Sequence, residues 1–118
     1  MIEDSGGFVV AILRHHAFHF TNERDLQDGI ALVLAEVPGV RREYICSPRD
    51  RLDFLLPGGV GIEVKVDGSL QALTRQLHRY AERPEITALI VVTSRRSHMQ
   101  VPTLLCGKPV TVVQVGTL

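Results

Sequence analysis

Asp53, Glu63 and Lys65 lie within one short segment whose pattern predicts a β-hairpin. Residues 51–66 read RLDFLLPGGVGIEVKV. Apolar and charged residues alternate on both sides of Pro57-Gly58-Gly59, which predicts two strands joined by a turn. A hairpin centred on Gly58 places Asp53 directly opposite Glu63, with Cβ atoms about 4.5–5.5 Å apart. Lys65 follows Glu63 by two positions and therefore points to the same face of the sheet.

Two carboxylates that face each other on paired strands repel, so stability alone does not favour this arrangement. A divalent cation changes the sign of the interaction, because hard ions such as Mg²⁺ take oxygen ligands at about 2.0–2.1 Å. A lysine beside such an ion can stabilise developing negative charge or help to activate a water. The pattern therefore predicts a site for metal-assisted attack on a phosphodiester.

Asp53, the turn, and Glu63-Val64-Lys65 together resemble the signature of the PD-(D/E)XK nuclease superfamily. This superfamily includes restriction endonucleases, archaeal-type Holliday junction resolvases and RecB-like exonucleases. Leu52 stands where the proline that names the motif is found. The resemblance implies that one or two Mg²⁺ or Mn²⁺ ions are held by Glu23, Asp53, Glu63 and the carbonyl of Val64. It also implies hydrolysis by a metal-bound water, with Lys65 orienting the water or stabilising the transition state.

Two further segments match this superfamily, and each also has a purely structural interpretation. Glu23 falls on the apolar stripe of a predicted helix, where the resolvase-like branch has a metal-ligating or water-positioning glutamate. As a structural residue, it would simply be a favourable charge at a helix N-terminus. Gln76 and Tyr80 match the Q-x-x-x-Y motif of RecB-like members, in which the glutamine supports the lysine or the phosphate. As structural residues, Tyr80 would belong to the core and Gln76 to the surface.

The remaining sequence predicts the elements that position the hairpin. Strands are expected at 8–13 and 17–20, then a helix capped by Thr21 or Asn22 that ends near residue 36. Further expected elements are a strand at 42–47, a Ser69-capped helix to about residue 82, a buried strand at 86–93, a short helix at 99–105 and a last strand at 108–115. The last strand is expected at an edge or beside the N-terminal strand. The expected fold class is α/β (α+β), with a mixed β-sheet flanked by helices.

The core order αβββαβ, with extra terminal strands, agrees with the restriction endonuclease-like fold that the resemblance implies. The resemblance covers roughly residues 20–95 of a single expected domain, 1–118. Leu52, Phe54 and Leu56 are expected on one face of the first hairpin strand. Asp53 is expected on the other face, where the two strands separate.

Basic residues are concentrated in the part of the chain that carries the predicted site. Residues 1–39 have two basic and six acidic residues, a net charge of −4, whereas residues 40–118 have eleven basic and seven acidic residues, a net charge of +4. Ordinary surface charge could also give this asymmetry. The residues predicted to contact nucleic acid are Arg49, Arg51, Arg75, Arg79, Tyr80, Arg95 and Arg96.

The composition is that of an ordinary globular domain, with 45% hydrophobic and 22% charged residues. No membrane span is expected, and two cysteines without metal or disulfide spacing favour a reduced, cytoplasmic setting. Histidines 15, 16 and 19 lack the ligand spacing of zinc sites. We expect a metal-dependent deoxyribonuclease without an organic cofactor. Endonuclease action on branched, nicked or terminal DNA is favoured, by a homodimer of phage or mobile-element type. The alternative is a non-catalytic nucleic-acid-binding or assembly module that retains the fold.

Overall fold

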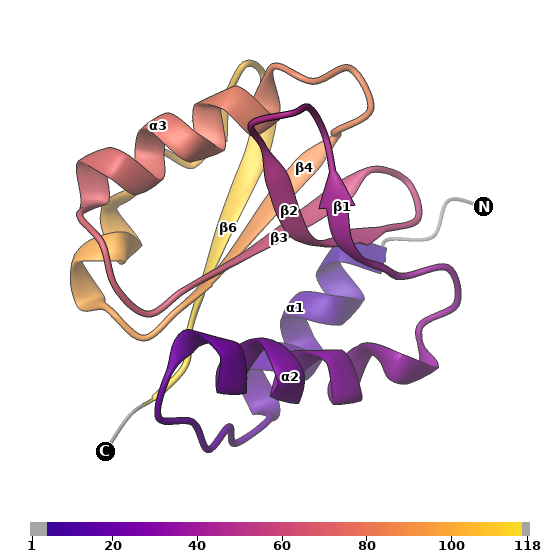
Figure 1. Ribbon diagram of the computed structural model, residues 1–118, viewed down its shortest axis with the longest axis vertical. Coiled ribbons are helices and arrows are strands. Elements are labelled where there is room, and N and C mark those ends of the chain that lie inside the picture. Colours follow the sequence, from indigo (N-terminus) through magenta and orange to yellow (C-terminus); the bar gives the residue numbers. More distant parts are fainter. Residues whose placement is uncertain (1–4, 117–118) are drawn as a thin grey trace.

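The computed structural model describes residues 5–116, which form a six-stranded mixed sheet with helices on both faces (Figure 1). The strands lie in the order β1-β2-β3-β4-β6-β5. Their bounds are β1 Arg41–Ile45, β2 Arg51–Leu56, β3 Val60–Lys65, β4 Ala88–Thr93, β5 Leu104–Leu105 and β6 Lys108–Gln114. The helices are α1 Ser5–His15, α2 Glu23–Val33 and α3 Leu70–Ala81, with 3-10 turns η1 Leu34–Glu36 and η2 Arg96–Gln100. No helix in this part of the chain is long and apolar enough to cross a membrane.

The predicted core order is confirmed. Strands β1, β2 and β3 pair antiparallel, and β4 then pairs parallel with β3 after the crossover through α3. Both predicted helix caps are present, because Asn22 accepts a hydrogen bond from the Asp25 backbone N–H and Ser69 accepts one from Ala72. Helices α1 and α2 pack on one face of the sheet and α3 packs on the other. The mixed sheet flanked by helices is therefore the observed architecture.

The N-terminal segment differs from the prediction, because residues 8–13 form part of helix α1 rather than a strand. Val9 and Leu13 are fully buried in the core that α1 shares with α2, whereas Phe8 is 63% exposed. This burial recurs every three to four residues, as in a helix. A short continuous apolar run fits a buried strand and a buried helix equally well, so periodicity alone could not decide between them. Residues 17–20 also form no strand.

The C-terminal segment also differs in part. The predicted last strand is present as β6, but it lies inside the sheet between β4 and the two-residue strand β5. No N-terminal strand exists beside it among the described residues. The short helix expected at 99–105 is replaced by η2, which ends at Gln100, and by β5. Val115 continues the alternation of β6 and its N–H donates to the Thr93 carbonyl at 2.8 Å.

The hairpin has the predicted register, because Phe54 pairs with Ile62 and Leu56 with Val60. Phe54 and Leu56 pack on the side of the sheet that α1 and α2 cover, but Leu52 packs on the side of α3. The prediction that all three share one face of the strand is therefore wrong for Leu52. Leu52 lies against Gly61, where an added Cβ would come within 2.8 Å of Leu52 Cδ1. The absence of a side chain at Gly61 leaves the space that Leu52 fills.

Candidate active site

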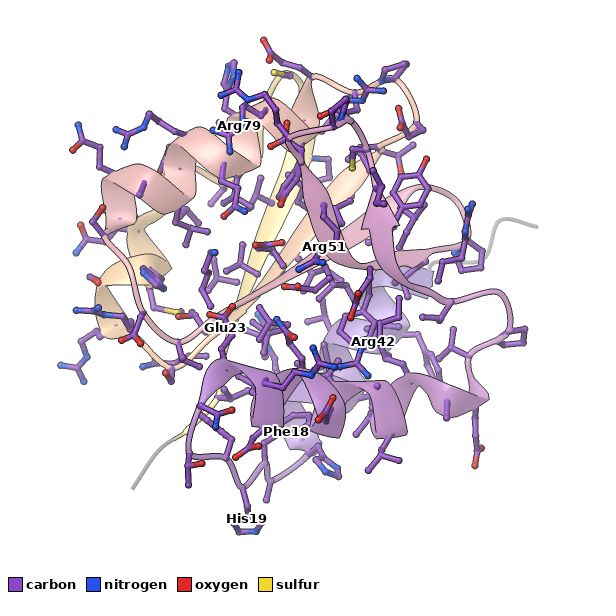
Figure 2. All side chains as sticks on the ribbon, in the orientation of Figure 1. Phe18, His19, Glu23, Arg42, Arg51 and Arg79 are labelled. Carbon is purple, nitrogen blue, oxygen red and sulfur yellow. The ribbon has the colours of Figure 1, made fainter. Side chains whose placement is uncertain are left out.

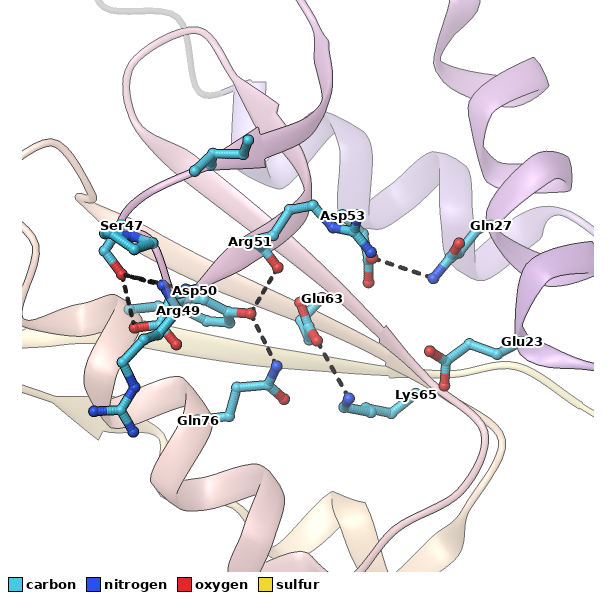
Figure 3. A pocket seen from close by; sticks show the side chains of 13 residues that line it. Glu23, Gln27, Ser47, Arg49, Asp50, Arg51, Asp53, Glu63, Lys65 and Gln76 are labelled. Atoms are coloured by element: carbon cyan, nitrogen blue, oxygen red, sulfur yellow. Dashed lines mark hydrogen bonds and ion pairs between the residues drawn. The ribbon is translucent and has the colours of Figure 1, made fainter.

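A cleft of about 480 Å³ opens between α2, the first half of the sheet and α3, and it gathers most of the predicted site residues. Figure 3 shows the carboxylates and Lys65 on its floor, with α2 and α3 on either side. The residues that line the cleft are Glu23, Gln27, Ile45, Ser47, Pro48, Arg49, Asp50, Arg51, Asp53, Glu63, Lys65, Gln76 and Tyr80. Segments far apart in the sequence thus meet at one place.

Asp53 occupies the place where the hairpin ladder ends. The Cα register of β2 with β3 is recorded from Leu56–Val60 to Phe54–Ile62 and stops one position before Asp53 and Glu63. Asp53 Oδ2 accepts a 2.7 Å hydrogen bond from the Val64 backbone N–H. The carboxylate thus replaces a backbone carbonyl of β2 as the acceptor for β3. Its other oxygen, Oδ1, accepts from the Gln27 amide of α2 at 3.1 Å. Asp53 therefore joins both hairpin strands to α2.

Glu63 is a buried carboxylate with one oxygen left without a partner. The residue is 3% exposed, and no group within residues 5–116 donates a hydrogen bond to Oε1. The other oxygen, Oε2, lies 3.5 Å from Lys65 Nζ (Figure 3). A buried polar atom without a partner is costly, and a charged one is costlier still. A cation or a proton bound at Oε1 would offset this cost.

Asp53 and Glu63 bind protons more tightly than ordinary carboxylic acids. Burial raises the pKa of Asp53 to about 6; the Val64 hydrogen bond opposes this rise and the charge of Glu23 adds to it. Burial also raises the pKa of Glu63 to about 8, and the neighbouring charge of Asp53 adds to this rise. Near neutral pH, a proton on Glu63 weakens its attraction to Lys65, so the full ion pair forms only when that proton leaves. Strongly perturbed acids in a cleft are typical of functional sites.

Glu23, at the start of α2, adds a third carboxylate to the cleft, from the side that α2 forms. Its Oε1 accepts a 3.2 Å hydrogen bond from the Val66 backbone N–H, just beyond the end of β3. Figure 2 shows Glu23 and Arg51 facing the same opening, whereas His19 lies at the far side of α2 and points away. Because Asn22 caps the helix, the position of Glu23 follows from the position at which α2 begins.

Gln76 and Tyr80 form a hydrogen-bonded chain at the back of the cleft. The Gln76 amide donates to the Tyr80 hydroxyl at 2.9 Å, and that hydroxyl donates to the Arg51 carbonyl at 2.8 Å (Figure 3). Tyr80 is fully buried, and burial raises the pKa of its hydroxyl, so it remains a neutral donor. Tyr80 borders the cleft from beneath, without exposed surface, and holds Gln76 and the start of β2 in place.

The predicted basic residues fall into two groups. Arg49 and Arg51 line the cleft, and Arg51 lies 3.7 Å from Glu43. Arg79 donates to Asp50 at 2.9 Å and so anchors the turn between β1 and β2. Arg79 and the other three arginines lie outside the cleft lining; Arg75, Arg95 and Arg96 are exposed, with Arg95 3.9 Å from Asp67.

Some cleft residues were missed by the sequence reasoning. Gln27 lies four residues after Glu23 on the same helical stripe, and this spacing was a usable signal. Glu43, which lies outside the cleft lining but contacts Arg51 at 3.7 Å, had none: it lies in edge strand β1 with a left-handed φ of 57° and also contacts Arg24 at 3.9 Å. Backbone strain of this kind depends on tertiary packing and leaves no trace in residue type.

The donor set suits a hard divalent cation. Three carboxylates and a backbone carbonyl are oxygen ligands of the kind that Mg²⁺ and Mn²⁺ prefer, and Glu63 Oε1 is a buried acceptor without a partner. Among the described residues, no three His, Cys, Asp or Glu side chains are gathered tightly enough to hold a metal as they stand. Glu23 and Asp53 instead bond to Val66, Val64 and Gln27. Side-chain rotation toward Glu63 would be part of cation binding.

Comparison of the chain with protein-family models, curated proteins and solved structures finds no match.

Proposed function

We propose that this protein is a divalent-metal-dependent nuclease of the PD-(D/E)XK type that hydrolyses DNA phosphodiester bonds. One observation carries the proposal: Glu63 Oε1 is buried without a partner beside Asp53, while Glu63 Oε2 lies 3.5 Å from Lys65. The element order, with α2, three antiparallel strands, α3 and a parallel β4, agrees with the restriction endonuclease-like fold that we propose for it.

The chain's own residues have distinct parts in this proposal. Glu23, Asp53, Glu63 and the Val64 carbonyl would hold the cation, with Gln27 orienting Asp53 through its amide. A bound Mg²⁺ or Mn²⁺ would supply Lewis-acid activation of water and neutralise phosphate charge.

Lys65 and Gln76 act on the reacting groups. Lys65 lies beside the acids and can stabilise negative charge on the phosphate or orient the attacking water. Gln76, fixed by Tyr80, presents its remaining amide groups to Lys65 or to a phosphate oxygen. Lys65 is the last residue of β3 and Gln76 lies in the middle of α3, so regular elements hold both side chains in position.

The substrate we favour is recognised by structure or only weakly by sequence. The cleft walls are the short turn between β1 and β2 and the ends of α2 and α3, which leaves few elements that could read base edges. Endonuclease action at junctions, nicks or ends fits this arrangement, and a homodimer would place two such clefts symmetrically on a branched DNA.

The test is a cleavage panel with Mg²⁺ or Mn²⁺ on supercoiled plasmid, linear duplex, single strands, flaps and a four-way junction. Wild type should cut at least one substrate, and Lys65→Ala should lose the activity. Lys108→Ala is the matched control, since that lysine is bonded to the Arg83 carbonyl and lies outside the cleft lining. Paired symmetric nicks on the junction would indicate a resolvase. Absence of cutting by wild type on every substrate would overturn the proposal.

A non-catalytic binding module is the second candidate. The observation that favours it is that Asp53 and Glu23 already have hydrogen-bond partners within the chain. In the same panel, this function predicts that wild type shifts DNA on a gel without cutting it. The binding should then be independent of Mg²⁺ and unaffected by Lys65→Ala.

A further inference from the structure

One wall of the cleft is the turn between β1 and β2, residues 46–50, which we call the rim turn. The Cys46 N–H donates to the Asp50 carbonyl at 2.8 Å and closes the turn. Helix α3 anchors it from outside, because Arg79 donates to the Asp50 carboxylate at 2.9 Å and Tyr80 donates to the adjacent Arg51 carbonyl at 2.8 Å. The rim turn is therefore held in one conformation before any ligand binds.

The rim of the cleft carries one apolar and one cationic side chain, those of Ile45 and Arg49. Ile45, the last residue of β1, lines the cleft and is 70% exposed. Arg49 also lines it, and its guanidinium has no hydrogen bond or ion pair within the described residues. A single exposed isoleucine needs no explanation elsewhere on a surface. Here it stands at the mouth of a cleft whose floor is charged, which points to a ligand with both an apolar face and a negative charge.

The depth of the cleft limits which ligand can reach the acids. Glu63, on the floor, is only 3% exposed, so a phosphodiester must enter the cleft to meet Glu63 and Lys65. A volume of about 480 Å³ is in the range of sites that enclose a small ligand, about 300–1,000 Å³. A flexible single strand can bend into such a space. In a duplex, base faces are stacked and covered, so only an unpaired nucleotide offers an apolar face together with its phosphate.

We propose that Ile45 and the rim turn form a subsite for an unpaired nucleotide next to the phosphate bound at the acids. Ile45 contacts the exposed face of the base, and Arg49 binds the adjoining phosphate. The inference rests on the proposed nuclease function and narrows its substrate to single-stranded or frayed nucleic acid. DNA and RNA share this chemistry, and separate arms of the test distinguish them.

The test measures binding of labelled 20-nucleotide single strands and of the same sequences as duplexes, as DNA and as RNA. Fluorescence anisotropy with Mg²⁺ is measured in a Lys65→Ala background to keep the strands intact. Ile45→Ser should weaken single-strand binding about three- to tenfold and change duplex binding less than about twofold. The matched control is Leu32→Ser, because Leu32 is 79% exposed on α2 and does not line this cleft. That variant should bind both forms like the background.

Arg49→Gln provides a second, independent measurement. It should weaken binding of the single strand and lower the slope of log affinity against log salt by about 0.7, as expected for loss of one phosphate contact. Because Ile45 and Arg49 are both exposed, circular dichroism of the variants should match the background. Equal loss of duplex and single-strand affinity in Ile45→Ser, or no loss in either, would overturn the subsite.

The two proposals can fail separately. If wild type cuts nucleic acid and Ile45→Ser binds single strands normally, the subsite is wrong and the nuclease stands. If wild type cuts nothing but Ile45→Ser still loses single-strand affinity selectively, the nuclease is wrong and the subsite remains as a binding site.

Discussion

Asp53 and Glu63 line the same cleft just beyond the last paired residues of β2 and β3, and the Asp53 carboxylate accepts the Val64 N–H at 2.7 Å in place of a strand partner. This relationship keeps two acids close while only one of them has its oxygens satisfied. The protein thus stores electrostatic repulsion at the floor of the cleft. A proton or a cation relieves it, and each of these can be tested.

The stability of the metal-free protein should fall as pH rises. The pKa values of Asp53 and Glu63 rise from 3.8 and 4.5 to about 6 and about 8 on folding. Between about pH 4 and pH 8 the folded state therefore holds more protons than the unfolded state, so the free energy of unfolding decreases with pH and levels off above pH 8. The loss should be on the order of a few kcal/mol.

Urea unfolding in EDTA at a series of pH values measures this loss. Glu63→Gln should flatten the pH dependence and make the protein more stable than wild type at pH 8, because it removes the buried charge. The explanation would be wrong if the Glu63→Gln curve kept the wild-type slope.

A divalent cation should stabilise the folded protein, most of all near pH 8, where the acids are ionised. At a concentration one hundred times the dissociation constant, Mg²⁺ or Mn²⁺ should add about 2.7 kcal/mol to the free energy of unfolding. Thermal unfolding in the presence and absence of the ion measures this effect without any substrate.

Asp53→Asn and Glu63→Gln should abolish the thermal shift. Glu36→Gln, which changes an exposed acid on η1, should keep the full shift. A shift of equal size in all these variants would mean that the ion binds elsewhere.

Tyr80→Phe should destabilise the protein by about 1–3 kcal/mol, because the Gln76 amide and the Arg51 carbonyl both lose their buried partner. Tyr44→Phe is the matched control: that hydroxyl is only part-buried and lies at a longer 3.3 Å from Glu85. Its cost should stay below that of Tyr80→Phe.

Gln76→Ala should reduce nuclease activity while leaving the urea midpoint nearly unchanged. If Gln76→Ala lowered stability as much as Tyr80→Phe, the glutamine would be structural.

The part of this site that could be predicted from sequence is the part fixed by local rules. Register in a short hairpin follows from its turn, so the pairing of Phe54 with Ile62 and of Leu56 with Val60 was accessible from spacing alone, one position short of Asp53 and Glu63. The start of α2 follows from its Asn22 cap, which placed Glu23 on the side of the cleft. The approximate positions of these residues could therefore be predicted without the tertiary fold.

The rest depended on contacts between distant segments. The ion pair of Arg79 with Asp50 joins α3 to the rim turn across 29 positions of sequence, so Arg79 was assigned to a ligand rather than to the turn. Helix α1 was taken for a strand because its apolar residues are consecutive, and only the packing against α2 and the sheet decides the matter.

Gly61→Ala should destabilise the protein by about 1–3 kcal/mol through overpacking, because the new Cβ would lie 2.8 Å from Leu52 Cδ1 and 3.2 Å from Leu89 Cδ2. Gly116→Ala is the matched control, since nothing lies within 4 Å of its added Cβ. Unfolding by urea measures the stability of both variants.

Leu52→Ala should lower the free energy of unfolding less in the Gly61→Ala background than in wild type, because the added methyl group fills part of the space that Leu52 vacates. Additive effects of the two substitutions would show that Leu52 does not owe its position to Gly61.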